Sequence, residues 1–126
     1  MVFGRKFLAS SSILAKHLCI RAFWTNGPNW PVGGEIDIVE GVSDYTHNQA
    51  TVHTNPGCTL ASGSASSLAI SGSVIGGVDC SALDTGNQGC GIRASTADSF
   101  GSGFNAVGGG VYASELQNYG CYAIFF

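Results

Sequence analysis

Apolar and β-branched residues between positions 21 and 53 recur in short runs that are separated by turn residues, without the spacing of a helix. Residues 22–25 predict a short apolar strand, and residues 35–41 predict the next one. Residues 26–34 contain two prolines and predict a loop between these strands. Residues 50–54 are expected to pair as a third strand. This part of the chain is therefore predicted to form neighbouring strands of a sheet.

The second half of the chain has a weaker pattern. Residues 59–89 are rich in Ser, Gly and Ala with isolated aliphatic residues, which predicts a long surface loop with little regular structure. Residues 104–107 and 111–113 flank three glycines at 108–110 and predict a strand hairpin. Residues 121–126 are apolar and predict a core strand, whose open edge would be an aggregation liability.

The composition agrees with short strands and tight turns, because 44% of the residues are hydrophobic, only 10% are charged and 19 are glycine. A formal net charge of -3 argues against disorder. Five Lys and Arg residues cannot form the basic stripe that a nucleic-acid partner needs. No apolar run reaches the roughly 18 to 20 residues of a transmembrane helix. A neutral substrate rich in hydroxyl groups fits this chain better.

Cysteine usage indicates a secreted protein with disulfides, because the cysteines lack the C-x-x-C spacing of a zinc site. Their number is odd, so at least one thiol has no partner within the chain. Three of the cysteines, Cys58, Cys80 and Cys90, bracket the long loop, and a disulfide between two of them would close it. The sequence does not determine which pair forms. Residues 1–20 form a divergent segment that resembles a signal peptide in its first half.

The strand at residues 35–41 carries three carboxylates. Alternate residues of a strand share a face, so Glu35 and Asp37 point to the same side. A β-bulge at Ile38 and Val39 would return Glu40 to that side as well. Carboxylates gathered on one face repel one another, and burying them without a purpose would cost several kcal/mol. One interpretation is that the three acidic residues simply decorate an ordinary exposed strand. Otherwise their arrangement calls for a chemical explanation.

Cleavage of a glycosidic bond supplies that explanation. Retaining glycosidases need two carboxyl groups about 5 to 5.5 Å apart, one as nucleophile and one as acid and base. Glu35 and Glu40 are the candidates, with Asp37 placed between them to orient the nucleophile. The same side chains with His53 have the hard ligands of a metal site, but we expect neither a metal nor a cofactor.

The segment at residues 22–34, followed by the acidic strand, closely resembles glycoside hydrolase family 16, and fungal laminarinase-like endo-1,3(4)-β-glucanases are the most similar members. Glu35, Asp37 and Glu40 match the E-x-D-x-x-E signature of the bulged branch of that family. The resemblance continues to about residue 113. It implies an all-β, concanavalin-like β-sandwich jelly roll, with residues 21–126 as a partial catalytic domain that lacks strands at both ends.

The resemblance also implies roles for individual residues. Glu35 would be the nucleophile, Asp37 its hydrogen-bonding helper and Glu40 the general acid and base. Substrate contacts are expected from four further residues: Trp24, Asn26, Trp30 and His53. Three of these have a second interpretation, because either tryptophan could instead pack in the core and the histidine, which the family places near the acid/base, could be a structural strand residue.

The sequence therefore predicts a secreted, extracellular or cell-wall enzyme that hydrolyses internal β-1,3 or β-1,3/1,4 linkages of β-glucan with retention. We expect it to be a monomer. Two alternatives are carried forward. The chain is an inactive fragment or noncatalytic glucan-binding module, or it is a cell-wall transglycosylase in which a sugar hydroxyl replaces water as acceptor.

Overall fold

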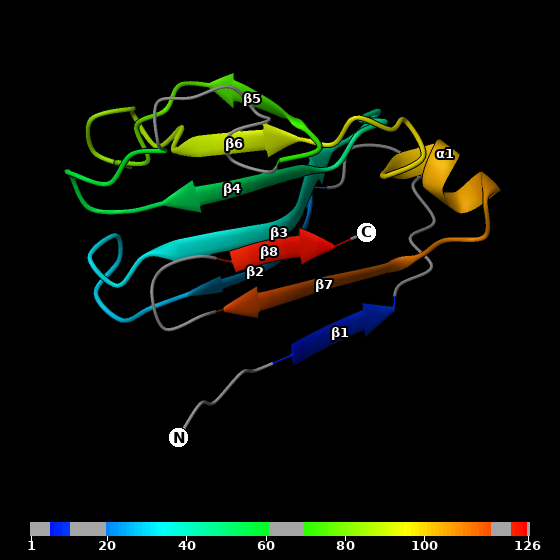
Figure 1. The fold of residues 1–126 in the computed structure, drawn as a ribbon, viewed down its shortest axis with the longest axis horizontal. Coiled ribbons are helices and arrows are strands. Elements are labelled where there is room, and N and C mark those ends of the chain that lie inside the picture. The colour runs from blue at the N-terminus through cyan, green and yellow to red at the C-terminus, as the bar shows by residue number, and fades with distance from the viewer. Residues whose placement is uncertain (1–5, 11–19, 61–69, 117–121, 126) are drawn as a thin grey trace.

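The computed structural model describes residues 6–10, 20–60, 70–116 and 122–125, which form two antiparallel sheets and one short helix (Figure 1). The larger sheet has the strand order β2-β3-β4-β6-β5 and the smaller one the order β1-β7-β8. The larger sheet contains β2 (Ile20–Asn26), β3 (Glu35–Val42), β4 (Gln49–His53), β5 (Ser73–Gly76) and β6 (Cys90–Arg93). The remaining elements are β1 (Lys6–Ser10), α1 (Gly101–Ala106), β7 (Val111–Leu116) and β8 (Tyr122–Phe125).

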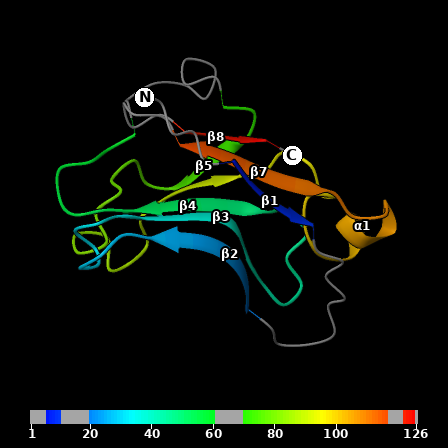
Figure 2. The ribbon, with the colours of Figure 1, turned by 90° about the horizontal axis from the view of Figure 1, so that it is seen from below.

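The two sheets lie face to face, with α1 at one end of the molecule (Figures 1 and 2). A cluster of buried apolar side chains joins the layers, since Ile38 and Val39 of β3 pack with Tyr112 of β7. Phe100 and Phe104 complete this cluster from the segment of α1. The predicted all-β sandwich is thus confirmed, with its core between β3 and β7.

The predicted bulge in β3 is present. Asp37 pairs with Thr51 of β4 and Glu40 pairs with Gln49, so two residues of β3 stand opposite a single residue of β4. Ile38 and Val39 are those two residues, and both are buried in the core cluster. Because two consecutive side chains face the core, the residues on either side of them are directed to the opposite face.

The predicted strand at residues 104–107 is wrong, because α1 occupies Gly101–Ala106. Phe100 and Phe104 are four residues apart and are both buried. A spacing of four brings such a pair to one side in a helix and in a strand alike, so the apolar pattern could not distinguish the two structures. Strand β7 confirms the second half of the predicted hairpin.

The loop predicted for residues 59–89 is only partly correct, because Ser73–Gly76 forms β5 at the edge of the larger sheet. The strand β6 that follows was also missed. A disulfide joins Cys80 to Cys90, while Cys58 is free and exposed. The bridge therefore closes a short turn instead of the long segment. Cys19, Cys121 and residues 61–69 lie outside the described residues.

Strand β1 lies within the segment that was predicted to be divergent or signal-like, and it pairs with β7. The predicted strand at the C-terminal end is confirmed as β8, which lies at the edge of the smaller sheet. Within the described part of the chain, no helix has the length and hydropathy needed to cross a membrane.

Candidate active site

The three carboxylates of β3 lie on the face of the larger sheet that is turned away from the core. The register with β2 places Asn26 opposite Glu35 and Trp24 opposite Asp37. Directly paired residues of neighbouring strands share a face, so both predicted substrate-binding residues of β2 lie beside the carboxylates. The Trp24 side chain is 49% exposed on this face, which favours a contact with a ligand over core packing.

Strand β4, which pairs with the other edge of β3, contributes further side chains to the same face of the sheet. Glu35 pairs with His53, Asp37 with Thr51 and Glu40 with Gln49. These β4 residues alternate in sequence and therefore point to one side. The structure thus gathers acidic, hydroxyl, amide and imidazole groups over the middle of the sheet.

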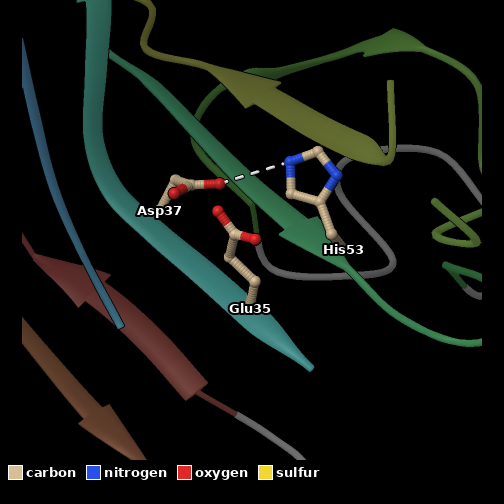
Figure 3. A group of neighbouring side chains, drawn as sticks. All are labelled: Glu35, Asp37 and His53. Atoms are coloured by element: carbon tan, nitrogen blue, oxygen red, sulfur yellow. Dashed lines mark ion pairs between the residues drawn. The ribbon is translucent and has the colours of Figure 1, made fainter. Parts of the chain in front are cut away.

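Glu35, Asp37 and His53 point toward one another (Figure 3). His53 Nε2 lies 3.3 Å from Asp37 Oδ2. The sequence placed this histidine near Glu40, whereas the structure pairs its ring with Asp37. Both residues are buried, so placing a charge on Asp37 costs solvation free energy.

Burial raises the pKa of Asp37 from 3.8 to about 7, and the negative charges of Glu35 and Glu40 and a hydrogen bond with the Glu35 side chain add to the effect. A carboxyl group with this pKa is neutral in mildly acidic solution. Neutral Asp37 can donate its proton in the hydrogen bond to Glu35. The carboxylate of Glu35 is then held by a neutral donor instead of being repelled by a second anion.

The loop between β2 and β3 supplies another donor to Glu35, because Trp30 donates its indole N–H to Glu35 Oε2. The loop is pinched at its base, where the Gly27 N–H donates to the Gly34 carbonyl over 2.8 Å. A Cβ on Gly27 would lie 2.3 Å from the Gly33 carbonyl oxygen, and a Cβ on Gly33 would lie 2.6 Å from the Gly27 carbonyl carbon, so Gly27 and Gly33 both need to be glycine. Trp30 is 43% exposed, and its predicted role in binding substrate stays a prediction.

Glu40 is held from β4. The Thr51 hydroxyl donates to Glu40 Oε2 over 3.0 Å and accepts from the Gln49 side-chain amide over 3.2 Å. Since the amide occupies the hydroxyl as an acceptor, the single hydroxyl proton is directed to Glu40. Sequence reasoning missed Thr51 and Gln49, although their spacing of two and four residues before His53 could have placed them on the same face.

The ring of His53 rests against the backbone of Gly89. Among the described residues, His53 Nδ1 has no hydrogen-bond partner. Gly89 has a φ of 61°, and a Cβ at this position would lie 2.8 Å from His53 Nδ1. Gly89 directly precedes Cys90 of the Cys80–Cys90 disulfide, so the turn that this bridge closes packs against one side of the imidazole ring.

Glu35, Asp37 and His53 each offer one ligand atom, and these atoms lie within 4.8 Å of one another. Carboxylate and imidazole groups at this separation could surround a divalent cation. The expectation that the site works without a metal stays a prediction.

Comparisons with known proteins agree on one family. The XgeA-like, catalytic domain of glycoside hydrolase family 16 matches residues 20–126. A probable glycosidase of Schizosaccharomyces pombe is 41% identical over 107 residues, which are 83% of this chain and 25% of that protein. The endo-1,3(4)-beta-glucanase xgeA of Emericella nidulans is 40% identical over 96 residues, or 76% of this chain and 14% of that protein.

Solved structures give the same result. A mutant of laminarinase 16A that cyclizes laminariheptaose superposes with a TM-score of 0.76 at 37% identity, covering 85% of this chain and 34% of the other. Laminarinase 16A from Phanerochaete chrysosporium, with two β-glucans in its donor and acceptor sites, gives 0.74 at 38% identity over 85% of this chain and 34% of the other.

The structural match confirms the predicted jelly roll of the laminarinase type. This chain spans a quarter or less of the length of the curated relatives named above and about a third of the solved chains. The match of the catalytic-domain family extends over most of the sequence, and the sequence identity to its members is about 40%. The chain belongs to glycoside hydrolase family 16, as an XgeA-like member related to fungal endo-1,3(4)-β-glucanases and laminarinases.

Proposed function

We propose that this chain carries the reaction centre of a retaining endo-glucanase that cleaves internal β-1,3 or β-1,3/1,4 linkages of β-glucan. The observation that carries the proposal is the bulge in β3, which brings Glu35, Asp37 and Glu40 to one face of the sheet. Retaining cleavage requires two carboxyl groups that lie about 5 to 5.5 Å apart and act on the same glycosidic bond.

In the first step, Glu35 attacks the anomeric carbon of the sugar while Glu40 protonates the departing glycosidic oxygen. The bond from carbon to that oxygen breaks, and a bond from carbon to the Glu35 carboxylate forms. In the second step, water attacks the same carbon and gives a proton to Glu40. The bond from that carbon to the Glu35 carboxylate breaks, which frees Glu35. The sugar product keeps the β configuration because both steps invert the carbon.

The residues around the two glutamates support these roles. The Trp30 indole and the hydrogen-bonded Asp37 fix the direction of the Glu35 carboxylate. The Thr51 hydroxyl fixes Glu40 independently. A nucleophile and an acid that are each held by their own donors need little reorganisation during the reaction.

Trp24 and Asn26 border the carboxylates on β2 and are proposed to contact the glucan. An indole face can stack on the apolar face of a sugar ring, and a side-chain amide can bond sugar hydroxyls. The β-glucans in the donor and acceptor sites of the related laminarinase 16A support a polysaccharide ligand.

Hydrolysis is tested by incubating the purified chain with laminarin and with lichenan and measuring new reducing ends. Glu35→Gln and Glu40→Gln should abolish release, while Asp44→Asn, which changes an exposed acid just after β3, should retain it. NMR of the first product should show the β anomer. If the unmodified chain binds laminarin but releases no reducing ends, the noncatalytic glucan-binding alternative replaces the proposal.

Transglycosylation is the second candidate, because an elongating family 16 β-1,3-glucosyltransferase superposes with a TM-score of 0.69 at 38% identity. The same covalent intermediate would then pass to a sugar hydroxyl. Mass spectrometry of products from laminariheptaose distinguishes the two candidates, since hydrolysis gives only shorter oligosaccharides and transfer also gives longer ones.

We also propose that the chain acts outside the cell. The disulfide between Cys80 and Cys90 supports this, because such bridges persist in oxidising compartments. Immunoblotting of the culture medium and of the cell lysate tests it: a chain found only in the lysate, with free thiols at both positions, would contradict the proposal.

A further inference from the structure

Asn48 precedes β4 and is the most thoroughly enclosed polar residue near the carboxylates, with an exposed fraction of 0%. Its side-chain amide contacts the first residue of the β3 bulge, Ile38, and the residue that follows the bulge, Glu40. Asn48 Nδ2 donates to the Ile38 carbonyl over 2.9 Å. The Glu40 N–H donates to Asn48 Oδ1 over 3.1 Å.

These two contacts replace backbone hydrogen bonds that the bulge removes from the pairing of β3 with β4. Where two residues of one strand oppose one residue of the next, the backbone ladder is locally disrupted. The pairing between β3 and β4 shifts between Asp37 and Glu40. A side-chain amide carries one donor side and one acceptor, as a peptide group does. Asn48 therefore takes the place of a missing peptide group of the partner strand.

The orientation of the amide follows from its partners. The Ile38 carbonyl can only accept and the Glu40 N–H can only donate, so the oxygen and nitrogen of Asn48 cannot be exchanged without losing both bonds. The backbone of Asn48 is also held, because its N–H donates to Ser99 Oγ over 3.0 Å and its carbonyl accepts from the Ala94 N–H over 2.9 Å.

Ser99 anchors this arrangement in turn. Its hydroxyl is buried and donates to the Thr96 carbonyl over 2.6 Å. The segment between β6 and α1 is thereby connected to the bulge through a single asparagine. No apolar residue of similar size could make these bonds, and aspartate would lack the donor for Ile38.

We infer that Asn48 is a positioning residue that fixes the β3 bulge and, through it, directs Glu40 to the face of Glu35. The catalytic consequence rests on the proposed function, in which Glu40 is the general acid. Asn48 acts only through the backbone of Ile38 and Glu40. Its loss should therefore impair proton donation by Glu40 more than attack by Glu35.

The first measurement needs no activity. Backbone amide hydrogen exchange, followed by NMR, reports whether the Glu40 N–H keeps its acceptor. Asn48→Ala should speed exchange at Glu40 by about fivefold or more, the effect expected for the loss of one net hydrogen bond. Ser99→Ala is the matched control: it removes a buried bond to the same asparagine but leaves the bridge, so exchange at Glu40 should stay within about threefold.

The second measurement separates acid catalysis from attack. Laminarioligosaccharides have a sugar alkoxide leaving group that needs protonation. 2,4-Dinitrophenyl β-laminaribioside instead releases 2,4-dinitrophenolate, which departs as an anion without protonation. Asn48→Ala should lower kcat/KM for the oligosaccharide by about 100-fold, at the lower end of what general acid catalysis contributes. The value for the aryl glycoside should fall far less, by no more than about fivefold, because attack by Glu35 on this substrate does not depend on a proton from Glu40.

Unchanged exchange at Glu40 in Asn48→Ala would overturn the inference, and so would equal losses of kcat/KM on both substrates. If that variant does not fold, Asn48→Ser replaces it, because its single hydroxyl is too short to bridge both groups, and the same two readings decide. If the unmodified chain cleaves neither substrate, the proposed function fails, while exchange at Glu40 still decides the role of Asn48.

Discussion

Replacing Asp37 by asparagine should make the stability of the chain less dependent on pH. Asp37 is 4% exposed and lies between Glu35 and Glu40 on β3. Burial and these negative neighbours raise its pKa from 3.8 to about 7. An asparagine of nearly the same shape cannot ionise, so Asp37→Asn removes the titration and keeps the packing.

The sign follows from proton binding in the two states. Between pH 4 and pH 7 the folded chain holds a proton on Asp37 that the unfolded chain has already released. The stabilisation is therefore complete below about pH 4 and is lost as the pH rises through about 7. The rise from 3.8 to about 7 corresponds to an upper limit of about 4 kcal/mol, lost at no more than about 1.4 kcal/mol per pH unit.

Urea unfolding monitored by tryptophan fluorescence, from pH 4 to pH 8.5, measures this difference. The two proteins should have similar free energies of unfolding near pH 4. Above pH 7, Asp37→Asn should be the more stable, by up to about 4 kcal/mol. The exposed Asp44→Asn is the matched control and should follow the unmodified chain at every pH.

Parallel pH profiles for Asp37→Asn and the unmodified chain would refute this reasoning. They would mean that Asp37 ionises in the folded state as readily as in the unfolded chain. A profile that diverges toward low pH instead of high pH would reverse the sign and would make Asp37 an ordinary stabilised carboxylate.

Three further outcomes are expected. Thr51→Val should lower kcat on laminarin by about 10-fold, because Glu40 loses the hydrogen bond that holds its carboxyl group, while Thr51→Ser should retain most activity; equal losses would contradict this. Gly89→Ala should lower the free energy of unfolding by about 1 to 3 kcal/mol, because its φ is 61° and the new Cβ would meet His53, and an unchanged urea midpoint would argue otherwise. Dialysis against EDTA should leave hydrolysis unchanged, and loss that added zinc restores would establish a metal requirement.

The acidic face could be predicted from the sequence because its spacing is restrictive. Glu35 and Asp37 share a face by simple alternation, and Glu40 joins them only if one extra residue interrupts the strand. The bulge was therefore predictable from three charged positions. Trp24 could be proposed from the apolar face of its indole, which can stack on a sugar ring, but only the register with β3 places Trp24 and Asn26 beside the carboxylates.

The hydrogen-bond partners of the carboxylates were not predictable in the same way. Thr51 and Gln49 become neighbours of Glu40 only through the register of β4, which the bulge shifts. Asn48 lies in an irregular segment, where no periodicity indicates direction. Helix α1 was missed because the three glycines at 108–110 suggested the turn of a hairpin, while the burial of Phe104 depends on a neighbouring layer that a local pattern does not contain.

The bulge connects the reaction centre to the core of the sandwich. Ile38 and Val39 are adjacent in sequence, yet both are buried in the same apolar cluster. A regular strand would turn one of them to the acidic face and move Glu40 to the core. The same bulged backbone therefore buries this aliphatic pair and places Glu40 beside Glu35. The apolar contacts that hold the sheets together thus also stabilise the bulge, whose backbone groups are hydrogen-bonded by Asn48.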